Sequence, residues 1–190
     1  CLIMVAALWA SLFFDIRRLE ENALGQARND GSNLIIAFKE SVSKTISALD
    51  EMMVATNSEN NHVAAGDYFI PKWVEESLLL KELGAQFSII RMDGNIAVST
   101  IPNYRGINLS DRPHVWNHYI PSTAQPYISV PVIGRASKKW SIQITRRIVK
   151  NDGSIGGVMG ISLDPFHFSR LLENLNLGKG SLVSLGGIDG

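Results

Sequence analysis

The stretch Trp140–Ser162, WSIQITRRIVKNDGSIGGVMGIS, decides the fold because it reads as two long strands joined at a tight turn. From Trp140 to Ile148 mostly apolar and polar residues alternate, which is typical of a strand with one apolar and one polar face. The turn Asn151-Asp152-Gly153 supplies residues that tolerate the positive φ of a hairpin. The return strand from Ile155 to Ser162 is rich in glycine, so backbone or ligand can approach it closely. The stretch predicts a β-hairpin.

More strands are predicted upstream of this hairpin. Gln86–Thr100 reads as a strand, an Asp-Gly turn and a second strand, which is a strong local hairpin signal. Tyr127–Ile133 predicts another strand, in which Pro131 favours an edge or a bulge. The segment Pro71–Leu83 predicts a short helix between these elements and the N-terminal part of the chain. A further helix is predicted at 111–119, with Ser110 as its cap.

A long helix is predicted from Asp15 to Thr56. Its apolar residues recur at spacings of three and four and form one stripe: Leu34, Phe38, Val42, Ile46, Leu49 and Met53. The stripe fits a helix packed on the domain's own sheet. It fits equally well a signalling helix near a membrane that also pairs with a second copy, and the sequence leaves both interpretations open.

The first fourteen residues, Cys1–Phe14, carry no charge. As a helix they cover about 21 Å, less than the roughly 30 Å of a bilayer's hydrocarbon core, so they are interpreted as the end of a transmembrane helix. A signal-peptide core and a buried helix are the alternatives. The following residues, FFDIRRLEEN, offer no small-residue cleavage site, which weighs against a signal peptide.

The composition excludes several classes of function. The 190 residues are 45% hydrophobic, which suits a globular core. The 18 basic and 18 acidic residues cancel, so the broad basic surface of a nucleic-acid-binding protein is not expected. The single cysteine, Cys1, permits neither an internal disulfide nor a thiol-based metal site.

The end of the chain resembles an earlier part of it. Gly180–Gly190, GSLVSLGGIDG, aligns without a gap on Gly84–Gly94, GAQFSIIRMDG. This match suggests a second copy of one module, cut after its first strand. The expected organisation is then the end of a transmembrane helix (1–14), a long signalling helix (15–56), a membrane-distal sensor module (57–163), and a linking helix with the first strand of a membrane-proximal module (164–190).

The order of these elements resembles the double-Cache (PDC) extracytoplasmic sensor domains of bacteria. The stretches FSIIRMDGNIAVST, SDRPHVW, PYISVPVIGR and WSIQITRRIVKNDGSIGGVMGISLDP carry the resemblance, which covers nearly the whole chain. The family implies an α+β fold, with a long N-terminal helix packed on a PAS-like five-stranded antiparallel sheet and the start of a second PAS-like module. More narrowly, the DRPH segment, the pair Arg146-Arg147 and the closing LGGIDG resemble sensor regions that precede GGDEF diguanylate cyclases.

The resemblance also implies a function. It predicts the ligand-sensing region of a transmembrane signalling protein in the bacterial inner membrane, with residues from about 15 onward in the periplasm. Its output would be a cytoplasmic diguanylate cyclase, regulated through the N-terminal helix, and a homodimer through that helix is expected. Alternatives are the sensor of a histidine kinase or chemoreceptor, or a dimerisation module without a ligand. No cofactor and no nucleic-acid partner are expected.

The family's binding motif suggests the ligand site. Arg112 in SDRPHVW matches the arginine that holds the ligand's carboxylate, and its planar guanidinium suits bidentate binding. Arg112 could instead pair with Asp111 or another acidic neighbour at a helix start, and the sequence does not decide between these roles. His114 and Trp116 stand near the motif's aromatic positions. Ser162 stands where the family has an amine-binding aspartate, so a carboxylate or other small anion is favoured over an amino acid.

The polar face of the hairpin strand could line the same cavity. This face carries Ser141, Gln143, Thr145 and Arg147, with Tyr127 and Ser129 predicted opposite. A solvated sheet face is the alternative. The complete predicted ligand site is Arg112, His114, Trp116, Tyr127, Ser129, Arg147 and Ser162.

Metal binding and catalysis have little support. His114 and His118 are four residues apart and would share a helix face, but no third ligand stands near them in the sequence. The sequence has no Gly-x-Ser-x-Gly elbow and no Walker or dinucleotide loop. No metal is therefore predicted, and this part of the protein is expected not to be an enzyme.

Overall fold

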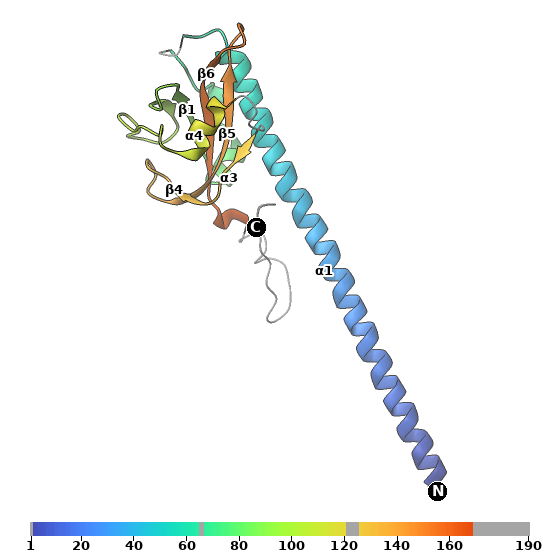
Figure 1. The fold of residues 1–190 in the computed structure, drawn as a ribbon. Helices are drawn as coiled ribbons and strands as arrows, with labels where there is room; N and C mark the ends of the chain where they lie inside the picture. The colour runs from blue at the N-terminus through green and yellow to red at the C-terminus, as the bar shows by residue number, and fades with distance from the viewer. Residues whose placement is uncertain (1, 65–66, 121–125, 169–190) are drawn as a thin grey trace.

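The N-terminal half of the structure is dominated by one helix. The computed structural model describes residues 2–64, 67–120 and 126–168, in which α1 runs without a break over Leu2–Asn60. Figure 1 shows that only the last part of α1 lies along the sheet, while its N-terminal part extends far from the rest of the chain. The long predicted helix is confirmed: it is continuous with the helix expected over 1–14, and it ends at Asn60 rather than at Thr56. Across the described residues, no helical stretch combines the length and the apolar character needed to cross a membrane.

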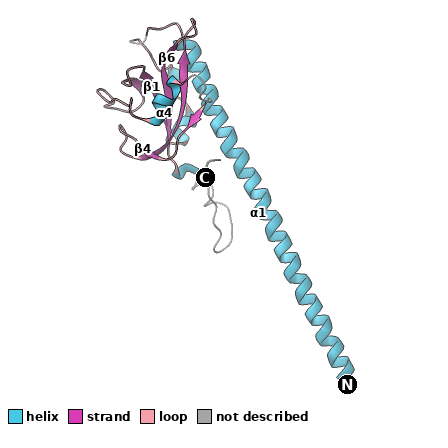
Figure 2. Ribbon diagram, in the orientation of Figure 1, coloured by secondary structure: helices cyan, strands magenta, loops and turns pink. Residues whose placement is uncertain are grey.

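The sheet is antiparallel and contains six strands. Its main order is β2-β1-β6-β5-β3, and β4 also pairs with β5. Figure 2 distinguishes the strands, in magenta, from the helices, in cyan. The strands are β1 Gln86–Arg91, β2 Ile96–Ser99, β3 Tyr127–Ile128, β4 Val132–Ile133, β5 Trp140–Val149 and β6 Ile155–Leu163. Both predicted hairpins are confirmed, as is the α+β class with its long N-terminal helix.

The predicted continuous strand Tyr127–Ile133 is wrong. The structure divides it into two strands of two residues, β3 and β4, which pair with different parts of β5. Pro131 lies at the break, where its missing N–H cannot take part in a ladder. This division is why the sheet has six strands where five were expected.

The apolar stripe of α1 packs on the chain's own sheet. Leu49 and Met53 are fully buried against strand residues that include Phe87, Ile144 and Ile161. Further along the helix, Phe38 packs at the margin of this core, with its ring 6.5 Å from that of Phe168. The C-terminal part of the stripe therefore packs on the chain's own sheet. Pairing with a second copy stays a prediction.

Polar contacts also hold α1 to the sheet. Arg146 on β5 donates two hydrogen bonds to Asp50 on α1, at 2.6 and 2.8 Å. Nearer the end of α1, the Asn57 side chain accepts from the backbone N–H of Val149 at 3.0 Å and donates to its carbonyl at 3.3 Å. The helix therefore has both apolar and ionic contacts with β5.

The short helices differ from the predicted ones. Pro71–Leu83 forms two helices, α2 Lys72–Glu75 and α3 Leu78–Glu82, because Ser77 begins a new helix by accepting from the N–H of Leu80. The helix predicted at 111–119 begins later, as α4 Pro113–Trp116 followed by the 3-10 turn Asn117–Tyr119.

Ser110 does not cap α4. Its hydroxyl donates to the Asn108 side chain at 2.6 Å, and the N-cap position belongs to Arg112, whose side chain makes no capping bond. Pro113 starts the helix because its fixed φ suits the first helical position and needs no hydrogen-bond acceptor.

The close approach predicted from the glycines of β6 occurs at Gly157. A side-chain carbon at this position would lie 2.3 Å from the carbonyl oxygen of Ile90 on β1. The sheet can pair here only because glycine has no side chain. The predicted second module falls largely outside the described residues, from 169 onward.

Candidate functional site

A small cavity lies on the sheet face opposite α1. Side chains alternate along β5, so Ile144 faces the helix while Gln143 and Thr145 face the cavity. The register aligns Gln143 with Ser162 of β6, and Thr145 with Gly160 and then Ser88 of β1. The volume is about 40 Å³, and the segment 132–137 together with Arg112 and His114 closes it. Polar groups from three strands and two covering segments therefore meet in one place.

The polar face of β5 is buried. Ser141, Gln143 and Thr145 are all inaccessible or nearly so, which excludes the solvated-face interpretation for them. The Ser162 hydroxyl donates to the side-chain oxygen Oε1 of Gln143 at 2.8 Å. The side-chain nitrogen Nε2 of Gln143 donates to the Ser141 hydroxyl at 2.7 Å. These side chains satisfy one another, and the network fixes the floor of the cavity.

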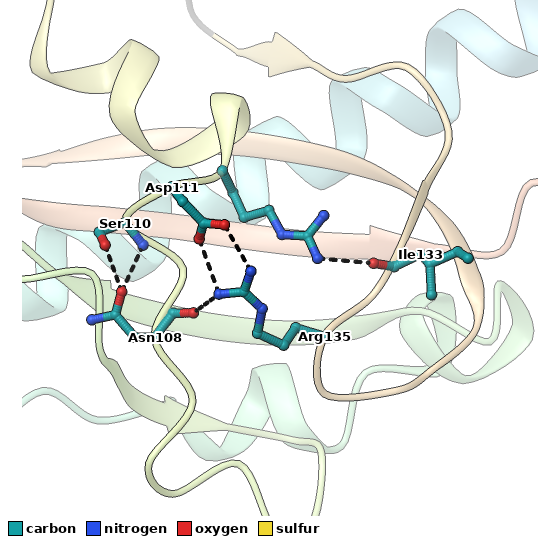
Figure 3. Close-up of polar contacts among 6 residues, drawn as sticks. Asn108, Ser110, Asp111, Ile133 and Arg135 are labelled. Atoms are coloured by element: carbon teal, nitrogen blue, oxygen red, sulfur yellow. Dashed lines mark hydrogen bonds and ion pairs between the residues drawn. The ribbon is translucent and has the colours of Figure 1, made fainter.

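Two arginines border the cavity, and they differ in their hydrogen-bond partners. Arg135 donates to both carboxylate oxygens of Asp111, at 2.9 and 2.7 Å, and to the carbonyl of Asn108 (Figure 3). These hydrogen bonds lower the pKa of the Asp111 carboxyl. Within the described part of the chain, Arg112 instead makes one long hydrogen bond, 3.4 Å, to the carbonyl of Ile133. The structure thus pairs Asp111 with Arg135, and the alternative in which Asp111 pairs with Arg112 is wrong.

Charge in the cavity is one-sided. Arg112 and Arg135 both line it, and none of the described residues that line it is Asp or Glu. Asp111 compensates Arg135 from outside the lining. The Arg112 guanidinium has five N–H donors, and only part of this capacity is taken up by the hydrogen bond to Ile133. The cavity therefore holds a cation whose remaining donors can bind a ligand.

Two buried histidines cover the polar face of β5. His118 lies beside Thr145, with 2.7 Å between its Nε2 and the hydroxyl. Burial, with a smaller contribution from Arg147, lowers the pKa of His118 to about 4. Burial also lowers the pKa of His114 to about 4, with a smaller contribution from Arg112. Both rings are therefore neutral at pH 7.

Lowering the pH from 7 to 5 should reduce the free energy of unfolding by about 3–4 kcal/mol, about half of it from each histidine. The unfolded chain takes up protons on both histidines near pH 6.5, whereas the folded chain does so only near pH 4. The histidines' contribution to stability is therefore complete above pH 6.5 and is lost as the pH falls toward 4. Urea unfolding at several pH values measures the slope.

A variant with both His114 and His118 changed to Gln is the control, and its stability should depend less on pH in this interval. The aspartates with lowered pKa values, Asp93, Asp111 and Asp152, titrate below 3.8 and leave this interval to the histidines. Equal slopes for the two proteins would contradict the assignment.

The structure brings only part of the predicted ligand site together. Arg112, His114 and Ser162 line the cavity, with Gln143 and Thr145 beside them. Four other predicted residues do not line it: Trp116, Tyr127, Ser129 and Arg147.

Each of these four has a different environment. Trp116 is 43% exposed, and Tyr127 packs its ring 6.1 Å from that of His118. The hydroxyl of Ser129 is held by the backbone of Val130 and Gln143. Arg147 donates to the carbonyl of Ile120. Proximity to the motif therefore did not place Trp116 at the cavity, and the predicted polar strand face did not place Tyr127, Ser129 or Arg147 there.

Three polar lining residues were not predicted: Ser88, Arg135 and Ser137. The alternation of polar and apolar residues in the first hairpin could have indicated Ser88, which the structure aligns with Gly160 of β6. Arg135 closes the stretch PYISVPVIGR, one of those that carry the family resemblance. Ser137 has no comparable signal, since its place depends on how the loop folds back. In the described ranges, no group of three His, Cys, Asp or Glu side chains could hold a metal ion.

Solved structures with this fold include extracellular sensor domains. One is the extracellular domain of rpHK1S-Z16, a protein named as a histidine kinase, with a TM-score of 0.66 and 22% identity over 78% of this chain and 61% of that one. Another is the sensory domain of the Campylobacter jejuni chemoreceptor Tlp3 with isoleucine bound, with a TM-score of 0.60 and 11% identity over 79% of this chain and 64% of that one. The ligand-binding domain of Tlp3 in complex with L-valine matches equally well, with a TM-score of 0.60 and 12% identity over 79% of this chain and 64% of that one.

These similarities establish a shared fold. The chain spans 61% and 64% of the rpHK1S-Z16 and Tlp3 structures, so it corresponds to a part of each. No protein-family model matches the chain, and no curated protein sequence matches it significantly.

Proposed function

We propose that this chain is the extracytoplasmic ligand-sensing region of a bacterial transmembrane signalling protein, and that its N-terminal helix regulates a cytoplasmic diguanylate cyclase. The region from about residue 15 onward lies in the periplasm, and residues 1–14 belong to the anchor in the inner membrane. Its role is binding rather than catalysis. The diguanylate cyclase output rests on the sequence resemblance alone, whereas the fold of known sensor domains supports the sensing role.

The observation that carries the proposal is the cavity on the sheet face opposite α1, which two arginines border and whose described lining residues include no Asp or Glu. A small carboxylate or other small anion fits this lining, because the Arg112 fork can donate two parallel hydrogen bonds to a carboxylate. An ammonium group has no compensating carboxylate there, so amino acids are disfavoured.

Strand β5 offers a route from the cavity to α1. Gln143 and Thr145 face the cavity, while the neighbouring Arg146 on the other face is paired with Asp50 of α1. A ligand that binds two arrangements of the sheet unequally would shift α1 through these contacts. Equal affinity for both arrangements would transmit nothing.

Two other functions have specific support. The fold similarity to sensor domains of a histidine kinase and a chemoreceptor favours one of those outputs in place of a cyclase. Exposed apolar residues on the extended part of α1, among them Leu24, Ile35 and Ile36, favour pairing of two copies. Such a homodimer is compatible with sensing, and without any ligand it would be the whole function.

Replacing Arg112 with Ala should abolish the increase in melting temperature that small carboxylates cause. The measurement is a thermal-shift screen of the 190-residue chain in detergent against small carboxylates, other anions and amino acids. A lost charge-assisted bidentate contact is expected to weaken binding about tenfold or more.

Arg105→Ala is the matched control, because Arg105 is exposed and lies outside the cavity lining. An Arg112→Ala protein that keeps the full shift would refute the assignment of the site. The output is tested separately, by reading the coding sequence beyond Gly190 for a GGDEF, kinase or chemoreceptor segment.

A further inference from the structure

His114 is the one side chain of the cavity lining whose buried polar atom has no partner among the described residues. It is 5% exposed, and no hydrogen bond reaches its buried Nδ1. Buried polar atoms in folded proteins nearly always have a partner, so an exception at a cavity points to a group that completes it. The residue lines the same cavity as Arg112 and stands two positions after it on the same short segment.

The neighbouring polar groups do not share this feature. Ser88 is hydrogen-bonded to Ser99 at 2.7 Å, and Ser162 donates to Gln143 at 2.8 Å. Thr145 is paired with His118. Among these cavity residues, His114 and the spare donors of Arg112 are therefore the groups left to recognise a ligand.

The chemistry of the missing group follows from the charge of its surroundings. The His114 ring is neutral at physiological pH, because burial and the nearby Arg112 both lower its pKa. A neutral imidazole nitrogen is a donor or an acceptor depending on the tautomer, and a hydroxyl can satisfy either. An ammonium group would enter a lining whose described residues supply two guanidinium groups and no carboxylate.

We propose that the ligand is a small hydroxycarboxylate, whose carboxylate binds Arg112 and whose hydroxyl hydrogen-bonds Nδ1 of His114. This inference rests on the proposed sensing function and specifies the substrate class of its site. The narrow cavity, about 40 Å³, favours acids of two or three carbons. His114 then determines specificity, and Arg112 determines affinity for any carboxylate.

The test uses two sets of probes that differ only at the second carbon. The three-carbon set is lactate in both enantiomers, propionate and L-alanine, and the two-carbon set is glycolate, acetate and glycine. Affinities of the 190-residue chain are measured by calorimetry. We expect the better-fitting hydroxy acid to bind about tenfold more tightly than its unsubstituted partner, and the amino acid to bind no better than that partner.

Two variants at His114 separate the hydrogen bond from packing. His114→Phe keeps a ring but no nitrogen and should reduce the hydroxy acid to the affinity of the unsubstituted acid. His114→Asn places an amide near the position of Nδ1 and should retain most of the preference. If His114→Phe does not fold, His114→Leu takes its place, with circular dichroism as the check on folding.

The outcomes distinguish this inference from the function on which it rests. Equal binding of hydroxy and unsubstituted acids, with loss of both in Arg112→Ala, would overturn the role of His114 and leave the carboxylate site standing. A preference that survives in His114→Phe would also overturn it. Failure of every acid in both sets to bind would overturn the small-hydroxycarboxylate proposal, whereas binding that is unaffected by Arg112→Ala would overturn the site itself.

Discussion

Replacing Leu49 with Ala is expected to lower the free energy of unfolding by about 2–5 kcal/mol. Leu49 is completely buried between α1 and the sheet, so the change leaves a cavity in the main core. Part of the loss is the transfer free energy of the removed carbons, and part is the contacts that the surrounding side chains no longer make. Urea unfolding followed by circular dichroism measures the loss.

The control is Leu24→Ala on the same helix, where the side chain is 65% exposed. It makes the same change in helix propensity without removing core contacts, so its effect should be within about 0.5 kcal/mol. Similar small losses for both variants would mean that α1 does not pack on the sheet in solution. A larger loss for Leu24→Ala would instead indicate that the extended part of α1 has a partner.

Removing Asp50 while Arg146 remains is expected to cost about 2–3 kcal/mol. Breaking a fully buried pair typically costs 3–5 kcal/mol because the remaining charge loses its partner, and this pair keeps partial contact with water. Its side chains are 21% and 23% exposed, and both guanidinium contacts with the carboxylate are short, 2.6 and 2.8 Å. Asp50→Ala, Arg146→Met and the double variant form the cycle, measured by urea unfolding.

The double variant should be more stable than the sum of the single losses predicts, since it leaves no unpaired charge. Asp111→Ala offers a comparison with the same bidentate geometry at the surface, where its carboxylate is 61% exposed. That variant should lose much less stability because water replaces the lost partner. Additive losses in the Asp50–Arg146 cycle would contradict a coupled pair between α1 and β5.

Local features of the sequence were sufficient for the main elements. The Asp-Gly turns and the alternation around them predict the β1–β2 and β5–β6 hairpins because a turn and the strands that flank it depend on neighbouring residues. The stripe that ends at Met53 likewise predicts which face of α1 is buried. Pro131 indicated an irregularity in Tyr127–Ile133, but it did not indicate that this segment forms two separate strands.

The candidate site was less accessible to sequence reasoning. His114 and Trp116 lie two apart on a short helix, so they point in different directions and only His114 faces the cavity. Arg147 shares a strand face with Gln143 but lies four residues further along, about 13 Å away, beyond the cavity. Arg135 was not predicted because its position at the cavity depends on how the loop after β4 folds.

Periodicity and turn chemistry within short segments were enough to predict the two hairpins and the buried stripe of α1, whereas the α+β class was implied by the family resemblance. The partner of Asp111, and the buried cavity atom that has no partner among the described residues, depend instead on how distant segments meet. Arg135 reaches Asp111 from a loop 24 residues away, and that pairing leaves Arg112 to the cavity. Such choices depend on distances between segments remote in the chain, which no local pattern specifies.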